Sequence, residues 1–372
     1  MFERACCSIT AGVFSFHYMA FIGEVLMAAI KVGTVTLEVP RVIFGTATLG
    51  NLFVDLPKET KLEISREWFK TGEMVVVDTA GKYGAGLALE VIGNNLRALN
   101  ADPDKVVISN KLGWKRVPLT TDEPSFEPGA WIGLKNDAVQ CISYDGILEC
   151  WEQGNELLGE GYVSQFLSVH DPDEYLAAAT SEGDRARRMA DILDAYRALG
   201  ELRDQGKCQA IGVGSKDWKA IAAIDEQVKL DWVMLANSLT IYRHPQPLLD
   251  FVESLNSRDI PIFNSAVFHA GYMVGGKSFD YRELDLSDAD DQKIADYRDG
   301  FFALCEKHSV KPAQACVEFA LSPPGVTSIA LSSSKPQRVS SNVELANTKL
   351  PSAFWKEAKE AGLIASDYSF LG

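Results

Sequence analysis

An aspartate and a tyrosine lie five residues apart in the sequence VVVDTAGKYGAG, which spans residues 75–86. The three consecutive valines predict a strand that is buried on both faces, and such strands are apolar along their length. Asp78 interrupts this pattern at the end of the strand, and Tyr83 follows on a glycine-rich turn. Asp78 is either a functional residue or the cap of the next helix, and the other strand ends help to decide between these interpretations.

Two further strand ends carry ionisable side chains. The apolar runs VVISNK and FLSVH place Lys111 and His170 at their carboxyl ends. Taken singly, Tyr83 could be a packed aromatic residue, Lys111 a solvated strand end and His170 a capping residue before the sequence DPDEY. Together on one rim, a carboxylate, a phenol, an ammonium and an imidazole suit proton transfer to a carbonyl or from a hydroxyl.

Each of these groups has an expected part in such a proton transfer. A tyrosine phenol has a pKa of about 10 and is a poor base at neutral pH. A nearby cation favours the phenolate, so we expect Lys111 to lower the pKa of Tyr83 while Asp78 holds Lys111 in a buried ion pair. A neutral His170 would orient the substrate oxygen by a hydrogen bond. None of these side chains takes up electrons, so a separate redox group is needed.

The elements that must position these residues follow a regular pattern. Short apolar runs occur eight times, separated by segments of helical periodicity such as residues 87–99. This alternation predicts an α/β fold, a (β/α)8 TIM barrel, because the alternative of an open doubly wound sheet rarely runs to eight regular units. The sequence KVGTVTLEVP, residues 31–40, predicts an N-terminal β-hairpin that caps the barrel. The long connection 112–147 is expected to overhang the site. The apolar runs are 42–47, 74–79, 106–111, 166–170, 210–214, 232–236, 261–266 and 327–334.

Composition narrows the class of partner. A formal charge of -15 and a pI near 4.9 disfavour a nucleic-acid partner, which would need a basic surface. Seven cysteines without CxxC spacing suit reduced thiols in a cytoplasmic protein. The five histidines are scattered, with no HxH or HExxH motif, so no metal site is predicted.

The N-terminal residues stand apart from this pattern. Residues 5–23 contain no Asp, Glu, Lys or Arg, which fits either a targeting segment or an extension of the domain. Polar residues interrupt the stretch, Glu24 follows it, and a second methionine at position 27 opens ordinary domain sequence. We therefore expect residues 1–26 to be an extension dispensable for the fold, and residues 27–372 to form the barrel domain. No membrane association is expected.

Four motifs in this order resemble those of the aldo-keto reductases. They are DTAGKYG at the second strand, SNKLGW at the third, LSVHDPD at the fourth and SSSKPQRVSSN after the eighth. The resemblance covers nearly the whole chain from about residue 38. It implies that Asp78, Tyr83, Lys111 and His170 form a catalytic tetrad. It also implies a nicotinamide cofactor, NAD or NADP, extended across the barrel mouth, which agrees with the absence of a GxGxxG motif.

Within the family, the sequences TLGNLF, KYGAGLALEVIG and LPSAFWKEAKEAGLI are most similar to the sugar 1-dehydrogenases. This resemblance implies oxidation of an aldose of the L-fucose, D-arabinose or L-galactose type at C1 to the lactone, by a monomer or small homo-oligomer. The alternatives are an aldehyde or ketone reductase or dehydrogenase, including one acting on pyridoxal, and a non-catalytic NADP-binding regulatory subunit. A metal-dependent barrel hydrolase would need HxH or clustered acids at the first strand, and VIFGTATLG has neither.

The resemblance also suggests residues around the nicotinamide and the pyrophosphate. Family members often carry Ser-Asn after the fifth strand to hold the carboxamide, whereas this chain has Ser215 and Lys216. Either residue could replace the family asparagine. Gly271 is expected near the pyrophosphate, because a backbone without Cβ can be approached closely.

Residues at the far end of the cofactor and in the substrate pocket are also predicted. Ser333, Arg338 and Asn342 are expected around the adenosine end. Arg338 could bind a 2′-phosphate bidentately, which favours NADP. The lysine that many NADPH-specific members carry is missing, so NAD stays open, and Arg338 could also be a solvated helix residue. Trp114 is expected as an aromatic wall of the substrate pocket, with a packed tryptophan as the alternative.

Overall fold

The computed structural model describes residues 27–33 and 35–372 of the chain, so the extension predicted at residues 1–26 lies outside the described residues. Eight of the described strands form a closed, parallel barrel in which neighbours in the chain are neighbours in space. The predicted (β/α)8 barrel is confirmed. The barrel strands are β3 (Val42–Gly45), β4 (Val75–Ala80), β5 (Val106–Leu112), β8 (Phe166–His170), β9 (Ala210–Ser215), β10 (Trp232–Ala236), β11 (Ile262–Ser265) and β14 (Val326–Ser332).

The inside of the barrel has an apolar half and a polar half. Alternate residues of a strand point to the same face, so each strand contributes a series of inward side chains. Near the amino ends of the strands these are large and apolar, and Val76, Phe166 and Trp232 pack together there. Further along the same strands, Asp78 and His170 line a cavity at the carboxyl ends. The apolar half therefore stabilises the barrel, and the polar half is available for chemistry.

A β-hairpin closes the amino end of the barrel. Strands β1 (Met27–Val32) and β2 (Val35–Pro40) pair antiparallel, with Met27 opposite Pro40. Val32 and Val39 are buried against the apolar half of the barrel interior. The predicted hairpin is confirmed, although its first strand begins at Met27 rather than near residue 31 because the strand pairing continues to that residue.

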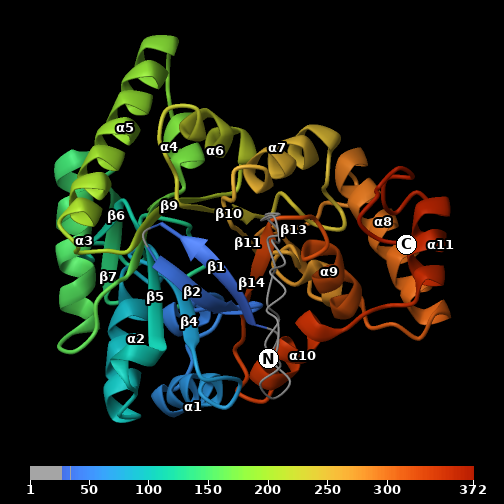
Figure 1. The fold of residues 1–372 in the computed structure, drawn as a ribbon, viewed down its shortest axis with the longest axis horizontal. Coiled ribbons are helices and arrows are strands. Elements are labelled where there is room, and N and C mark those ends of the chain that lie inside the picture. The colour runs from blue at the N-terminus through green and yellow to red at the C-terminus, as the bar shows by residue number, and fades with distance from the viewer. Residues whose placement is uncertain (1–26, 34) are drawn as a thin grey trace, which may run out of the picture.

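The helices surround the barrel, and the blue hairpin lies over its centre in Figure 1. Among the described residues, none of the helices combines the length and the apolar character that a membrane span requires. The α-helices are α1 (Lys58–Trp68), α2 (Leu87–Ala98), α3 (Tyr144–Leu158), α4 (Pro172–Ala177), α5 (Glu182–Asp204), α6 (Trp218–Asp225), α7 (Gln246–Asn256), α8 (Ala289–Lys307), α9 (Pro312–Ala320), α10 (Arg338–Asn347) and α11 (Ser352–Glu360). Short elements are η1 (Ala47–Gly50), η2 (Pro103–Lys105), η3 (Tyr272–Val274), β12 (Ser278–Phe279) and β13 (Arg282–Glu283).

The long connection between β5 and α3 folds over the carboxyl end of the barrel. Its ends pair as the antiparallel strands β6 (Trp114–Pro118) and β7 (Asn136–Gln140). Between these strands the chain returns to the barrel rim, where Trp131 forms a β-bridge with Leu52. Glu127 and Trp131 from this connection line the cavity, so the expected overhang is confirmed.

Candidate active site

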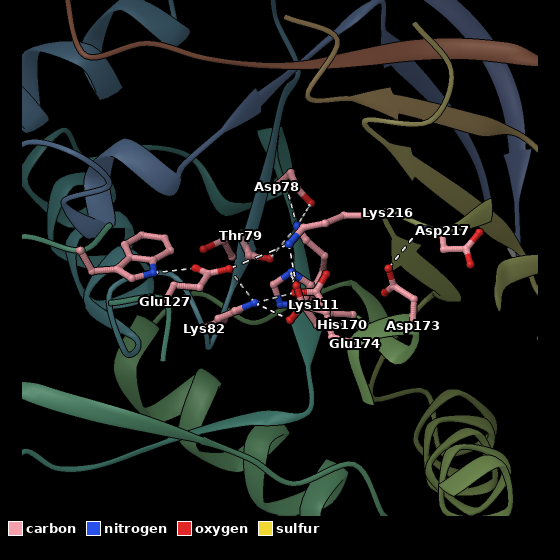
Figure 2. A network of polar contacts seen from close by, with 12 residues as sticks. Asp78, Thr79, Lys82, Lys111, Glu127, His170, Asp173, Glu174, Lys216 and Asp217 are labelled. Carbon is pink, nitrogen blue, oxygen red and sulfur yellow. Dashed lines mark hydrogen bonds and ion pairs between the residues drawn. The ribbon is translucent and has the colours of Figure 1, made fainter. Parts of the chain in front are cut away.

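Asp78 and Lys111 form a buried ion pair at the rim of the barrel, on the neighbouring strands β4 and β5 (Figure 2). The Lys111 ammonium donates to both carboxylate oxygens of Asp78 at 2.6 Å and to the Thr79 carbonyl at 3.3 Å. A Cβ at residue 214 on β9 would lie 2.8 Å from Lys111 Cδ, so Gly214 leaves room for the lysine stem. Asp78 caps no helix, because the N-cap of α2 is Gly86, and Lys111 is not a solvated strand end.

Tyr83 lies on a tight turn directly above this ion pair. The turn has left-handed backbone at Gly84, with φ of 62°. A Cβ at this glycine would lie 2.3 Å from the Gly50 carbonyl oxygen. The Lys111 ammonium is 4.8 Å from the centre of the Tyr83 ring, and the His170 ring meets that ring edge-on at 5.6 Å. The structure thus brings the four sequence-predicted residues together around one phenol.

His170 ends β8 and presents an unpaired ring nitrogen. Its Nδ1 is buried and has no hydrogen-bond partner in the part of the chain that the structure describes, whereas Nε2 lies 3.6 Å from Asp171 Oδ2. Burial lowers the pKa of His170 well below 6.5, although the Asp171 carboxylate opposes this shift. His170 is not the cap of α4, because that position belongs to Asp171. A neutral imidazole in this place can hydrogen-bond a substrate oxygen.

The protonation of Tyr83 differs from the sequence-based expectation. Burial of the phenol raises the pKa of Tyr83 well above 10, and the negative charge of Asp78 raises it further. The Lys111 ammonium, 4.8 Å from the ring centre, does not outweigh these effects, because it is shared with both oxygens of Asp78 at 2.6 Å. The phenol therefore stays protonated at neutral pH and is suited to donate a proton to a carbonyl oxygen.

A cavity of about 280 Å³ opens above these residues and has aromatic walls. Trp131 lines it and stacks on Tyr83, with ring centres 5.9 Å apart and an interplanar angle of 29°. Phe53 and Tyr281 also line the cavity and are exposed, and the centres of their rings lie 5.7 Å apart. Aromatic faces with a few polar groups between them are typical of small-molecule sites.

The predicted wall residue Trp114 lies elsewhere. Its ring packs against Phe126 at 5.8 Å and has the Lys82 ammonium 4.7 Å from its centre. It does not line the cavity, and Trp131 from the same connection lies there instead. Trp114 begins β6, whereas Trp131 belongs to the irregular stretch between β6 and β7, whose path depends on tertiary contacts. Spacing along the chain alone could not distinguish the two tryptophans.

Gly271 lies where backbone is open to the cavity. It lines the cavity with φ of 92°, and no atom lies within 4 Å of the place that a Cβ would occupy. His269, two residues before Gly271, anchors this loop. Its buried ring contacts Asp280 Oδ1 and Thr240 Oγ1, each at 2.8 Å. A fixed loop with open backbone can approach a bulky anionic group closely.

Ser215 and Lys216 follow β9 and line the cavity, but both already have partners. Ser215 Oγ donates to the Asp217 carbonyl at 3.3 Å, and the Lys216 ammonium lies 2.6 Å from Glu174 Oε1. Asn237, which follows β10, also lines the cavity, and its buried Oδ1 is unpaired within the described chain. Sequence reasoning missed this residue, although the strand-end rule applies equally to WVMLAN.

The segment after β14 lies beside the cavity. Thr48, which lines the cavity, donates from Oγ1 to the Ser333 carbonyl at 2.9 Å. Arg338 begins α10 and is exposed, and Asn342 lies one turn further along the helix, on the same face. Ser333, Arg338 and Asn342 are outside the cavity lining, which ends at Ser332. The unpaired amide oxygen, the open backbone and this exposed guanidinium fit a nicotinamide dinucleotide.

Known proteins are similar to this chain over most of its length. The model of the Aldo/keto reductase family matches residues 41–362. A pyridoxal 4-dehydrogenase from Microbacterium luteolum is 25% identical over 344 residues, which cover 90% of this chain and 97% of the relative. A D-threo-aldose 1-dehydrogenase from Pseudomonas sp is 25% identical over 343 residues, covering 88% of this chain and 95% of the relative.

Solved structures show the same fold. A glycerol dehydrogenase from Gluconobacter oxydans has a TM-score of 0.64 at 17% identity, covering 92% of this chain and 98% of its own. An aldo-keto reductase from Bacillus halodurans, in its holo form, has a TM-score of 0.64 at 16% identity. This match covers 90% of the present chain and 96% of the Bacillus halodurans chain. With the family model spanning most of the chain and both relatives being dehydrogenases, this protein is an oxidoreductase that belongs to the aldo/keto reductase family.

Proposed function

We propose that the protein oxidises an aldose of the L-fucose, D-arabinose or L-galactose type at C1 to the lactone, with NAD or NADP. The observation that carries this proposal is the convergence of Tyr83, the Asp78–Lys111 ion pair and neutral His170 on one cavity. A cyclic sugar needs both an acid/base and an apolar surface for its C–H face, and Trp131 offers that surface. The likeness to a D-threo-aldose 1-dehydrogenase supports the same substrate class.

In the proposed reaction, Tyr83 exchanges a proton with the anomeric oxygen of the sugar. The His170 ring hydrogen-bonds the same oxygen and holds it beside Tyr83. In the direction of oxidation the Tyr83 phenolate accepts the proton, and Lys111 keeps a positive charge close to that phenolate. A bound oxidised nicotinamide ring would accept the hydride that leaves C1 of the sugar. We propose that Asn237 and Ser215 hold the carboxamide and that the backbone at Gly271 lies against the pyrophosphate.

A second candidate is the oxidation of an aromatic substrate such as pyridoxal. The cavity walls favour it as well, because Trp131 and Tyr281 present aromatic faces that can stack on a flat ring. A pyridoxal 4-dehydrogenase is among the similar proteins. Both candidates use the same proton transfer at Tyr83 and differ in what the cavity walls contact.

A substrate panel distinguishes these candidates. We expect L-fucose, D-arabinose and L-galactose to reduce NAD or NADP faster than pyridoxal or glycerol does, measured by absorbance of the reduced cofactor. Turnover of pyridoxal alone would transfer the proposal to the second candidate. No turnover of any of these compounds with either cofactor would contradict both.

The cofactor preference is tested at Arg338. We propose that Arg338 binds the 2′-phosphate of NADP. Arg338→Ala should therefore raise KM for NADP by about tenfold or more and leave KM for NAD nearly unchanged. This magnitude follows because a hydrogen bond to a charged group contributes about 1.5–3 kcal/mol. The matched control is Lys356→Ala, which removes an exposed cation on α11. Equal effects of Arg338→Ala on the two cofactors would remove this residue from phosphate binding.

A further inference from the structure

Lys82, the residue before Tyr83, is a buried cation surrounded by carboxylates. Its side chain is 3% exposed. Its ammonium lies 2.8 Å from Asp171 Oδ2, 2.9 Å from Glu174 Oε2 and 2.9 Å from Glu127 Oε1. Figure 2 shows Glu127 reaching Lys82 from one side and Glu174 from another. A buried charge is costly unless it is paired, so these contacts form a built cluster rather than a chance meeting of side chains.

The three carboxylates come from different parts of the barrel rim. Asp171 and Glu174 belong to the segment after β8 that includes α4. Glu127 belongs to the overhanging connection between β6 and β7, and its backbone is left-handed, with φ of 44°. Non-glycine residues keep such a conformation only when their contacts hold them there. The contact with Lys82 is therefore one point where the overhanging connection is fastened to the turn that carries Tyr83, beside the hydrogen bond from Arg116 Nε to the Ala85 carbonyl.

Glu127 also orients a wall of the cavity. Its second carboxylate oxygen, Oε2, accepts a hydrogen bond from Trp131 Nε1 at 2.8 Å. Trp131 in turn stacks on Tyr83, the neighbour of Lys82. The four residues thus form a closed ring of contacts, in which each fixes the position of the next.

We propose that Lys82 is a positioning residue that, through Glu127, holds Trp131 against Tyr83 and so sets the geometry of the substrate cavity. This proposal rests on the proposed function, in which Tyr83 exchanges the proton and Trp131 contacts the substrate. Lys82 is itself outside the proton transfer. Loss of its contact with Glu127 should weaken substrate binding and loosen the overhanging connection, with a smaller effect on the chemical step.

A matched pair of substitutions tests this role. Glu127 and Glu174 each lie 2.9 Å from Lys82, and each bridges Lys82 to a second donor, Trp131 for Glu127 and Lys216 for Glu174. A glutamine has one acceptor oxygen and can satisfy only one of two donors. Glu127→Gln and Glu174→Gln therefore remove equivalent contacts, but only the first releases the overhanging connection.

The first measurement is hydrogen exchange, which needs no substrate. The amides of Ala130 and Ile132 are hydrogen-bonded to the carbonyls of Glu127 and Asn51, at 3.1 Å and 3.0 Å. We expect both amides to exchange about tenfold faster in Glu127→Gln and in Lys82→Met than in the unsubstituted protein. Their exchange rates should be unchanged in Glu174→Gln. The second measurement is kinetic, and KM for the sugar should rise about tenfold in Glu127→Gln with kcat changed much less.

Each outcome decides the proposal. Equal exchange rates in Glu127→Gln and Glu174→Gln would overturn it, as would unchanged KM in Glu127→Gln. If Lys82→Met does not fold because Asp171 is left unpaired, Glu127→Gln still gives the answer, since it keeps the contact between Lys82 and Asp171. If the enzyme turns over none of the proposed substrates, the exchange rates still report on Lys82, so failure of the proposed function is seen separately.

Discussion

Replacing Tyr83 with phenylalanine should lower kcat by about 10²–10⁴, the range typical of general acid–base catalysis. The substitution removes the hydroxyl that we propose exchanges the proton, and it keeps the ring that stacks on Trp131 and meets His170 edge-on. Cofactor affinity should stay nearly unchanged, because the phenol faces the substrate. Steady-state turnover and cofactor titration by fluorescence measure the two effects.

The pH dependence provides the control for this substitution. The pKa of Tyr83 lies well above 10 in the structure, so oxidation, which needs the phenolate, should rise with pH through and beyond the neutral range. Reduction needs the protonated phenol and should stay level over the same range. Tyr83→Phe should abolish the rise in the oxidation rate. Near-normal turnover in Tyr83→Phe would show that the four residues are not a catalytic unit.

Replacing Lys111 with methionine should reduce turnover to a similar extent, and more than Asp78→Asn does. Methionine leaves the phenol without a positive charge beside it, so a phenolate becomes still less favourable. Asparagine at position 78 removes one anchor of Lys111 but keeps the ammonium and its bond to the Thr79 carbonyl. The measurement is kcat/KM for the three proteins at one pH.

Stability must be followed in the same experiment. Breaking a buried ion pair by removing one partner costs about 3–5 kcal/mol, so both substitutions should lower the midpoint of thermal unfolding. Burial raises the pKa of Asp78, and without Lys111 this carboxyl should take up a proton more readily. The comparison therefore uses the folded fraction of each protein. Higher activity in Lys111→Met than in Asp78→Asn would contradict the role given to the ammonium.

The barrel could be predicted because its strands are buried on both faces. Such strands are continuous apolar runs, and all eight runs correspond to barrel strands, with no end displaced by more than two residues. The same argument placed Asp78, Lys111 and His170, since parallel strands bring their carboxyl ends to one rim. Strand order in the chain was sufficient to make these side chains neighbours.

The walls of the cavity and the pKa values of the site residues could not be predicted from the sequence as well as the barrel could. Trp131 rather than Trp114 lines the cavity because the overhanging connection is shaped by contacts with distant residues such as Asn51. The cluster around Lys82 joins residues up to 92 positions apart in the chain, so no local sequence pattern predicts it. The pKa of Tyr83 depends on how completely water is displaced from the phenol, which spacing along the chain does not reveal.

The division of labour between strands and connections has a consequence for how this enzyme can diverge or be redesigned. Asp78, Lys111 and His170 belong to barrel strands, whereas Trp131 and Tyr281 belong to connections. Connections tolerate insertions and substitutions that strands inside a closed barrel do not. Grafting a different overhang onto the same rim should therefore exchange one substrate preference for another while the residues proposed for proton transfer keep their positions.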